Sequence, residues 1–550
     1  TKNTARPAGA GIIRPGRRCL NPESMRKLLI LATALLSATC AEAPQPEINV
    51  IPRPLSMEQG DGAFRLGRSC PIGYDDPALQ SVAALCAGYL TEEGERKPVV
   101  ADKPVHKGID LQLDDTLAGE EYTLSATKKG VSICGGSPRA VLYGVQTLRQ
   151  LIDGDRVPVV EIRDEPYFGY RGAMFDVARY FYPVEEVKRF IDIMALHKLN
   201  TFHWHLTDDQ GWRIEIKRYP ELTRIGSQRR ETLIGHYKTS DEYDGKPHGG
   251  YYTQDEIREV VAYAAERCID IIPEIELPGH SMAALASYPW LGCTKGPYEV
   301  RTTWYYSSDV LCAGRETTFE FLENVLTEVL GLFPSKYIHV GGDECPKARW
   351  KACPDCQRRM RREGLADEDA LQSYFVCRIE EWLHVHGREM IGWDELLEGG
   401  VTPSTIVMSW RGTEGGIEAA KLGNRVIMAP RFYFYLDYYQ TSDPERNGEP
   451  LSIGRNVPIR KLYGYDPFDR LDEAQSRNIL GVQANLWTEY ISTMDHAEYM
   501  LLPRLAAMSE VAWATERRDY DDFVRRLGSL RGLYDREGYR YADFVFRGIE

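Results

Sequence analysis

The pattern of hydrophobic and polar positions changes near residue 168 of the chain. Before that point, residues 46–165 mix short strand-like runs, such as GIDLQLD at residues 108–114, with helix-like runs at Asp76–Leu90 and Ala140–Leu151. Short strands mixed with single helices are typical of an α+β fold. We therefore predict a small α+β domain over residues 46–165.

After that point, strand, loop and helix patterns repeat. The run YPVEEVKRFIDIMALHKLN has apolar side chains at the i, i+3, i+4, i+7 spacing of an amphipathic helix: Val187, Phe190, Ile191 and Met194. A second helix is predicted to begin at Thr253, because Thr253 and Glu256 have the spacing of a capping box.

Short apolar runs alternate with the predicted helices. Eight strand and helix units fit an enlarged (β/α)8 TIM barrel better than a doubly wound sheet. We predict that this α/β barrel forms a larger domain over residues 168–515, followed by a helical extension over residues 516–550. The eight runs are residues 172–175, 201–205, 269–274, 337–340, 390–392, 405–408, 425–428 and 479–484.

The N-terminal segment has the features of a targeting signal. A basic MRK is followed by an apolar run at residues 28–36 and then by small residues, which is the pattern of a signal peptide over residues 25–43. A buried amphipathic helix is the alternative. We expect export to the periplasm, the outer membrane or the medium, with membrane attachment only through a lipid on Cys40. Residues 1–24 would be an upstream extension.

The composition restricts the class of ligand. The formal net charge of −14 leaves no broad basic face for a phosphate backbone, so we expect no nucleic-acid partner. The 32 Tyr and 10 Trp supply many flat rings, which suit the faces of sugars and the surfaces of protein partners alike.

Acidic and aromatic residues follow the predicted strands at their carboxyl ends, where the active site of a TIM barrel lies. Each of them alone has an ordinary explanation, but packing does not easily produce a ring of such side chains at one end. Along the chain they are Asp176 and Arg179, with Arg171 at the start of the same strand, then Asp208, Glu276, His280, Asp343, Glu344, Trp393, Trp410, Tyr435, Asp437, Trp487 and Glu489.

Asp343 and Glu344 are adjacent acids behind the strand-like run YIHV. At an extended strand end, neighbouring side chains point to opposite faces, so the two carboxylates would reach a ligand from different directions. This favours a division of labour, in which one carboxylate stays ionised and the other, with a raised pKa, delivers a proton. Gly341 and Gly342 would let the backbone approach closely. An exposed acidic loop or a helix N-terminus is the alternative.

The motif HWHLTDD leaves the role of its histidines open. His203 and His205 share one face of a strand, as a metal-binding pair does on barrel hydrolases, but a hydrogen-bonded network or core packing also fits. Asp208 and His280 would instead form a relay to a proton donor, with the carboxylate fixing the imidazole.

Three tryptophans at the ends of different strands suggest a cage for a small apolar group or for the C–H face of a sugar, although a single Trp is more often a core residue. These are Trp393, Trp410 and Trp487. In that case Arg171, Asp437 and Glu489 would bind hydroxyls through charge-assisted hydrogen bonds.

The cysteines offer a weaker signal. Cys353 and Cys356 have C-x-x-C spacing and Cys345 lies close upstream, but no fourth ligand follows at the spacing of a zinc finger. We therefore expect a disulfide or simple loop packing there, and no metal or cofactor in the protein. An exported protein is free to form disulfides.

A series of motifs along the chain resembles those of a known family. The motifs RGAMFDVAR, FHWHLTDDQGWR, IIPEIELPGH, HVGGDECPKARW, GWDE, YLDYYQ and QANLWTE occur in order over residues 168–515. This series resembles the β-N-acetylhexosaminidases of glycoside hydrolase family 20, which also have a small α+β domain before the catalytic barrel.

The resemblance implies hydrolysis of terminal non-reducing N-acetyl-D-hexosamine (GlcNAc or GalNAc) from β-linked glycans. The 2-acetamido carbonyl of the substrate would attack the anomeric carbon and form an oxazolinium intermediate. Asp343 would orient the acetamido N–H, and Glu344 would act as acid and then as base. By similarity, Tyr435 binds the acetamido oxygen, the three tryptophans enclose its methyl group, and Arg171, Asp437 and Glu489 bind hydroxyls. Asp208, His280 and Glu276 would support the acid.

Two other functions remain as alternatives. A metal-dependent hydrolase of the amidohydrolase type would use the histidine pair. An ordinary two-carboxylate retaining glycosidase would pair Glu344 with Asp437 or Glu489, which would leave Asp343 without a role.

Overall fold

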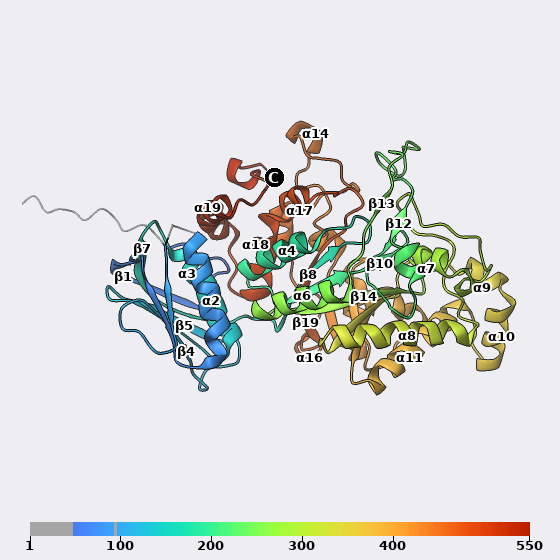
Figure 1. Cartoon of the computed structure of the whole chain (residues 1–550), viewed down its shortest axis with the longest axis horizontal. Helices are drawn as coiled ribbons and strands as arrows, with labels where there is room; N and C mark the ends of the chain where they lie inside the picture. The colour runs from blue at the N-terminus through green and yellow to red at the C-terminus, as the bar shows by residue number, and fades with distance from the viewer. Residues whose placement is uncertain (1–47, 93–95, 550) are drawn as a thin grey trace, which may run out of the picture. The chain divides into compact units, whose positions relative to one another are not determined.

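A computed structural model describes residues 48–92 and 96–549 of the chain. The predicted signal peptide over residues 25–43, with Cys40, lies outside the described residues. Within the described ranges, every helix is too short or too polar to cross a membrane. Figure 1 traces the chain through a small domain built on an open sheet and a larger domain built on a barrel.

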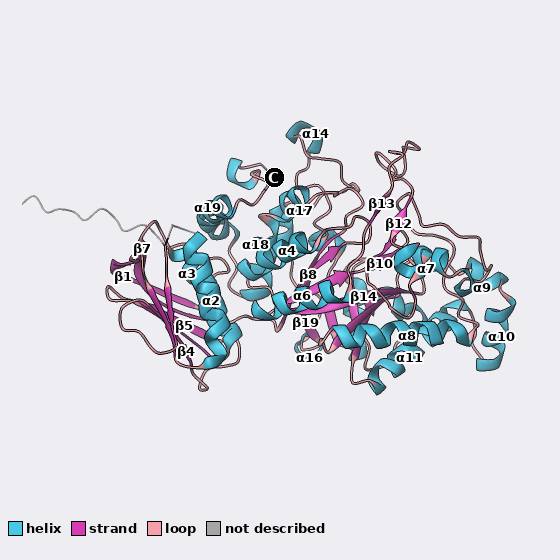
Figure 2. Ribbon diagram, viewed as in Figure 1, coloured by secondary structure: helices cyan, strands magenta, loops and turns pink. Residues whose placement is uncertain are grey.

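The described part of residues 48–165 forms a mixed seven-stranded sheet with the strand order β1-β7-β5-β6-β4-β2-β3. Helices α2 and α3 pack against each other and against the sheet (Figure 2). Helix α3 begins at a fixed point because the Ser137 hydroxyl accepts a hydrogen bond from the backbone N–H of Ala140 and Pro138 occupies the first turn. The elements are β1 (Ser56–Arg65), β2 (Pro71–Tyr74), η1 (Pro77–Leu79), α2 (Gln80–Glu92), β3 (Val99–Ala101), β4 (Ile109–Leu113), β5 (Tyr122–Ala126), β6 (Val131–Gly135), α3 (Pro138–Leu151) and β7 (Arg156–Asp164).

The second domain is a closed barrel of eight parallel strands. Each of the eight predicted runs coincides with one of these strands to within a few residues, so the predicted fold class is confirmed. The strands are β8 (Tyr170–Asp176), β9 (Thr201–His205), β14 (Asp270–Leu277), β15 (Tyr337–Gly341), β16 (Glu389–Trp393), β17 (Ile406–Ser409), β18 (Val426–Met428) and β19 (Ile479–Leu486).

Helices surround the barrel strands. The capping box predicted at Thr253 is present, since the side chains of Thr253 and Glu256 each bind the backbone N–H of the other residue. The principal helices are α4 (Val184–Leu196), α6 (Gln254–Glu266), α8 (Glu316–Leu332), α10 (Pro354–Glu363), α11 (Glu368–Val385), α12 (Glu414–Leu422), α17 (Met494–Leu501), α18 (Arg504–Trp513) and α19 (Tyr520–Glu537).

Shorter elements occupy the loops between these strands and helices. They are β10 (Thr207–Asp208), β11 (Gly211–Trp212), α5 (Glu221–Arg224), β12 (Gln228–Arg229), β13 (His248–Gly249), α7 (Met282–Ser287), η2 (Pro289–Leu291), α9 (Ala348–Ala352), η3 (Asp394–Gly399), α13 (Arg431–Phe434), α14 (Pro444–Asn447), α15 (Ile459–Tyr463), α16 (Glu473–Ser476) and η4 (Val545–Arg547).

Apolar side chains of the strands pack inside the barrel. Tyr170, Ile272, Trp393, Met408 and Ile427 belong to a buried cluster contributed by the strands themselves, separate from the larger core that the strands share with the helices. A filled interior fixes the carboxyl ends of the strands relative to one another. The residues that follow those ends are therefore held in a defined arrangement.

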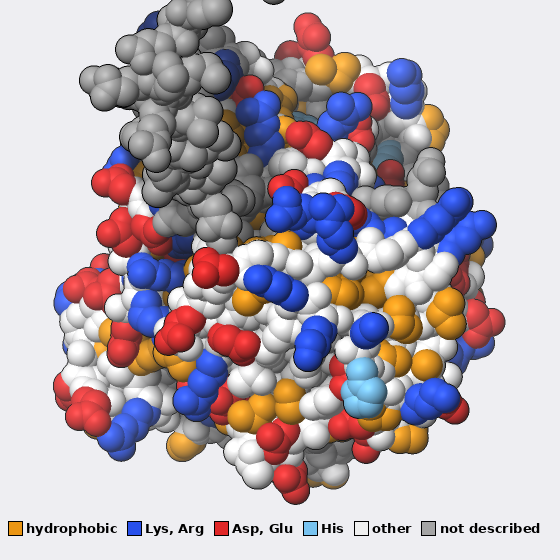
Figure 3. Space-filling view, turned by 90° about the vertical axis from the view of Figure 1, so that its left-hand side faces the viewer, with side chains coloured by type: hydrophobic (Ala, Val, Ile, Leu, Met, Phe, Trp, Pro, Cys, Tyr) orange, Lys and Arg blue, Asp and Glu red, His pale blue; other side chains and the backbone are white. Residues whose placement is uncertain are grey.

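The C-terminal helices also contact the small domain. Trp513 at the end of α18 belongs to the core of the small domain, and its indole N–H donates a hydrogen bond to Asp164 (2.9 Å). Arg526 of α19 binds the backbone carbonyl of Val50 (2.8 Å). On the face drawn in Figure 3, Lys and Arg side chains are interspersed with Asp and Glu.

Candidate active site

The two adjacent acids lie just beyond the carboxyl end of β15. Gly341 and Gly342 adopt φ values of 65° and 99°, and a Cβ on Gly341 would lie 1.8 Å from a carboxylate oxygen of Glu276. Glycine is therefore required for this turn. Glu344 itself has a φ of 40°, an unusual conformation for a residue with a side chain. The strained turn presents both acids at the C-terminal face of the barrel.

His280 contacts both acids. Its Nε2 lies 3.6 Å from Asp343 and 3.5 Å from Glu344, and its Nδ1 lies 3.1 Å from Asp208. One oxygen of each acid and a ring nitrogen of His280 lie within 4.8 Å of one another. Although burial disfavours the imidazolium, Asp208 and Asp343 raise the pKa of His280 well above its usual value. The predicted pair of Asp208 and His280 is therefore present, and the imidazole of His280 lies between Asp208 and the two acids.

Asp343 and Glu344 differ in exposure. The Asp343 side chain is 10% exposed and one of its carboxylate oxygens has no hydrogen-bond partner among the described residues, whereas the Glu344 side chain is 34% exposed. Burial raises the pKa of Asp343 to about 6; His280 lowers it and Glu344 raises it further. The sequence interpretation gave the raised pKa to the proton donor. The structure assigns a raised value to Asp343, because Asp343 is the more deeply buried acid.

The histidines of HWHLTDD form a hydrogen-bonded network around Glu274, a residue that the sequence analysis did not single out. The imidazole of His205 binds Glu274 through Nδ1 and Asp208 through Nε2 (2.9 Å). Burial opposes the charge on His205, but Glu274 and Asp208 raise its pKa to about 10. Glu274 also accepts a hydrogen bond from the indole N–H of Trp393 (3.0 Å). The network thus joins the relay to the aromatic residues.

Arg171 does not lie in this site, and the prediction that it binds sugar hydroxyls is wrong. Arg171 is the second residue of β8 and therefore lies at the amino end of the strand, opposite to the acids. Its buried guanidinium binds Glu120 (3.0 Å) and the hydroxyl of Tyr143, both in the small domain, and the backbone carbonyl of Lys198 (3.1 Å). Its role is to join the two domains.

Arg179, three residues beyond the carboxyl end of β8, is the arginine of the site. Its Nη2 lies 2.9 Å from Asp208 and its Nη1 lies 3.3 Å from Asp176, while its guanidinium lies 4.9 Å from the centre of the Trp487 ring. Burial opposes the charge, but these carboxylates and Glu489 raise the pKa of Arg179. Its position after a strand end was visible in the sequence.

Asp437 and Glu489 lie on the Arg179 side of the site. Burial raises the pKa of both carboxyls, and Arg179 opposes this effect at Glu489. One oxygen of the Asp437 carboxylate is buried and has no hydrogen-bond partner among the described residues. A buried acceptor without a partner is costly, and a ligand hydroxyl would satisfy it.

Four aromatic rings form a continuous wall next to these carboxylates. The Trp487 ring centre lies 6.1 Å from that of Trp393 and 6.2 Å from that of Tyr435, and Tyr435 stacks on Trp410 at 6.0 Å. The indole N–H of Trp410 donates a hydrogen bond to Glu395 (2.8 Å), a second residue that the sequence analysis missed. The rings predicted as a cage are therefore neighbours in the fold.

Two further residues border the acids. The carboxylate of Glu276 is buried, and neither of its oxygens has a hydrogen-bond partner among the described residues. Burial together with Asp343 raises the pKa of Glu276 well above its usual value. Tyr306, from the run WYYSSDV, lies with its ring centre 6.5 Å from that of His280, and its hydroxyl accepts a hydrogen bond from Tyr305 (2.8 Å). This places part of that run beside the acids.

The site thus combines a partly exposed acid, a buried acid, a charged relay and a wall of aromatic rings at the carboxyl face of a TIM barrel. Carboxylates of this kind, next to rings that fit sugar faces, define a glycosidase. Such a site supports acid and base catalysis on a sugar acetal.

Comparison with known proteins gives the family. Residues 168–516 match the family model described as glycosyl hydrolase family 20, catalytic domain, and residues 47–165 match domain 2 of the same family. The chain therefore belongs to glycoside hydrolase family 20 and is a glycosidase.

Individual relatives agree with this assignment. A β-hexosaminidase of Porphyromonas gingivalis is 44% identical over 94% of this chain and 67% of its own length, and one of Vibrio furnissii is 39% identical over 84% and 76%. The fold is similar to the crystal structure of an exo-β-N-acetylglucosaminidase from Vibrio harveyi in complex with N-acetylglucosamine. The two structures superpose with a TM-score of 0.80 and share 34% sequence identity. The match covers 90% of this chain and 78% of the Vibrio harveyi chain.

Proposed function

We propose that this protein removes terminal β-linked N-acetylhexosamine residues by a retaining, substrate-assisted mechanism. The acetamido carbonyl oxygen of the substrate attacks the anomeric carbon, the bond to the leaving oxygen breaks, and an oxazolinium ion forms. Water then opens this ion and restores the acetamido group with retention of configuration. The observation that carries the proposal is the position of Asp343 and Glu344, both of which face His280 Nε2 and so lie on one side of the site.

This geometry favours the assisted mechanism over two-carboxylate catalysis. An ordinary retaining glycosidase needs one carboxyl on each side of the scissile bond. Adjacent acids that face one imidazole do not provide that arrangement. They do provide an ionised acceptor for the acetamido N–H and a separate proton donor, which are the two groups that the assisted mechanism requires.

The difference in exposure supports the two assignments. Glu344 is accessible enough to meet both a leaving oxygen and an incoming water, so it acts first as general acid and then as general base. Asp343 is buried near the Tyr435 hydroxyl, whose pKa is raised by burial and, to a smaller extent, by the charge of Asp343. There it accepts the acetamido N–H and stabilises the positive charge that develops on the oxazolinium ring.

The aromatic wall and the polar side chains next to it bind the rest of the sugar. Trp393, Trp410 and Trp487 enclose the acetyl methyl group, and Tyr435 donates a hydrogen bond to the acetamido oxygen. Asp437, Glu489 and Arg179 bind ring hydroxyls through charge-assisted hydrogen bonds.

A panel of aryl β-glycosides that differ only at C2 and C4 tests this proposal. We expect hydrolysis of the 2-acetamido gluco and galacto substrates and a loss of about 1,000-fold or more when a hydroxyl replaces the acetamido group, because the nucleophile is then missing. Comparable rates on the 2-hydroxy substrates would contradict the proposal. The ratio of rates on the two C4 epimers would define the preference for N-acetylglucosamine or N-acetylgalactosamine.

A further inference from the structure

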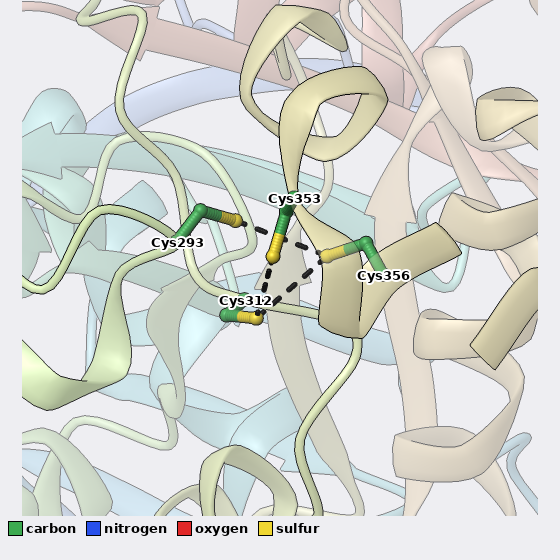
Figure 4. Close-up of side chains that lie close together, drawn as sticks. All are labelled: Cys293, Cys312, Cys353 and Cys356. Atoms are coloured by element: carbon green, nitrogen blue, oxygen red, sulfur yellow. Dashed lines mark hydrogen bonds between the residues drawn. The ribbon is translucent and has the colours of Figure 1, made fainter. Parts of the chain in front are cut away.

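Outside the catalytic site, four cysteines from three separate segments converge on one point. Figure 4 shows the side chains of Cys293, Cys312, Cys353 and Cys356 directed toward a common centre. Their sulfur atoms lie within 4.8 Å of one another, and three of the four residues are buried. We propose that these four cysteines bind a structural zinc ion.

The sulfur geometry fits this metal. The Sγ to Sγ distances are 3.8 Å for Cys293 and Cys356, 3.8 Å for Cys312 and Cys353, and 3.7 Å for Cys312 and Cys356. A tetrahedron of thiolates around Zn²⁺, with Zn–S bonds of about 2.3 Å, has edges of about 3.8 Å. A disulfide requires a separation of about 2.05 Å. The four sulfurs thus have the spacing of a tetrahedral ligand set.

The backbone brings the four residues together from distant positions. An antiparallel bridge pairs Gly292 with Leu311, and the N–H of Cys312 donates to the carbonyl of Leu291 (2.8 Å), so that Cys293 and Cys312 become neighbours. Cys353 is the N-cap of α10 and Cys356 lies in its first turn. The positive end of the helix dipole stabilises thiolates at this position.

Charge and packing around the cluster also favour bound zinc. Four thiolates and one Zn²⁺ carry a net charge of about −2, which requires cationic neighbours. The guanidinium of Arg315 binds Asp355 (2.8 Å) and the backbone carbonyl of Cys293 (3.3 Å), and so joins both arms of the cluster. A Cβ on Gly314 would lie 2.3 Å from the backbone nitrogen of Cys356, so this close approach requires glycine.

The cluster connects two segments that border the catalytic acids. Cys293 and Cys312 bracket the loop that carries Tyr306, whereas Cys353 and Cys356 follow Glu344 within a dozen residues. The same two segments are joined by Arg349, which binds Asp309 (3.0 Å). Zinc would therefore fix the loop beside the proton donor, on the side where the leaving group departs.

This proposal departs from the expectation of no metal. In the sequence, Cys345 is the cysteine nearest upstream of the C-x-x-C motif, and no fourth ligand follows at finger spacing. In the structure Cys345 is not part of the cluster, and the missing ligands come from two loops far upstream. No local spacing connects Cys293 and Cys312 with the C-x-x-C motif.

The test is the metal content of the full chain, purified without chelators and measured by inductively coupled plasma mass spectrometry. We expect about one zinc per chain. Cys312→Ser and Cys356→Ser should each lower this content at least fivefold. Cys345→Ser and Cys377→Ser, which change cysteines outside the cluster, should retain it.

A second measurement uses the wild-type chain, so its result does not depend on whether the variants fold. Titration of the wild-type chain with an organomercurial should release one equivalent of zinc to a chromogenic chelator as four thiols react. Two disulfides, Cys293–Cys356 and Cys312–Cys353, found by mass spectrometry of the unreduced chain without stoichiometric zinc would overturn the proposal. Stoichiometric iron in place of zinc, or a zinc content unchanged in Cys312→Ser, would also overturn it. None of these readouts depends on glycosidase activity.

Discussion

Arg179 Nη2 lies 2.9 Å from Oδ2 of Asp208, and both side chains are buried at the carboxyl end of the barrel. The ion pair fixes a guanidinium on the side of the site where Asp437 and Glu489 lie. It also connects this guanidinium with His280, which binds Asp208 and contacts Asp343 and Glu344.

Replacing Arg179 should therefore weaken catalysis. For Arg179→Lys we expect kcat/KM on an aryl N-acetylglucosaminide to fall by about 100-fold, because the compact ammonium cannot reproduce the planar fork. Arg171→Lys is the matched control. It lies at the domain contact and should lower the Tm while leaving KM within about twofold. A loss of kcat/KM in Arg171→Lys equal to that in Arg179→Lys, with the Tm unchanged, would contradict both assignments.

The pKa of Asp343 predicts an acidic limit to activity. Asp343 must be ionised to accept the acetamido N–H, and its pKa is raised to about 6. As the pH falls through this value the carboxylate gains a proton, so kcat/KM should decrease tenfold per unit below pH 6. The pH profile of kcat/KM reports the free enzyme. The residual activity of Asp343→Asn should not show this decrease below pH 6. The same decrease in the variant would mean that another group causes it.

The same pKa shift predicts that Asp343→Asn stabilises the fold. The folded state holds the proton more tightly than the unfolded chain, so stability is highest below the unfolded pKa of about 4 and decreases as the pH rises through about 6. Removing the charge should recover about 3 kcal/mol at pH 7.5 and much less at pH 4. Thermal unfolding at both pH values measures the difference.

The exposed Asp115→Asn serves as the control for this stability measurement, since its side chain lies on the surface of the small domain. It should change the Tm at neither pH. Equal Tm values for Asp343→Asn and the wild-type protein at pH 7.5 would mean that the ionised carboxylate does not destabilise the folded state.

Glu344→Gln should show the signature of a missing acid. A dinitrophenyl leaving group departs without protonation, so kcat/KM on such a glycoside should fall by about tenfold or less, whereas a β-linked disaccharide should lose about 1,000-fold. Asp343→Asn should lose activity on both substrates alike, because its role does not depend on the leaving group. Equal losses for Glu344→Gln on both substrates would show that Glu344 is not the proton donor.

The period of the apolar residues was sufficient to predict the fold. All eight barrel strands were found because each is a short apolar run bounded by a helix pattern. The residues of the active site were harder to predict from the sequence. Arg171 was chosen instead of Arg179 although it stands at the start of its strand, and the catalytic face of a barrel is at the other end. Glu274 was missed because it lies inside the apolar strand β14 (IIPEIEL), where the pattern suggests only packing.

In the proposed mechanism, the acetamido group of the substrate is the nucleophile. Aryl 2-acetamido glycosides with zero, one, two or three fluorines on the acetyl methyl group test it directly, because fluorine withdraws electrons from the carbonyl oxygen with little change in shape. We expect kcat/KM to fall steeply with each fluorine, over several orders of magnitude across the series. Values of kcat/KM that stay within a few-fold across the series would contradict it and point to a nucleophile on the enzyme.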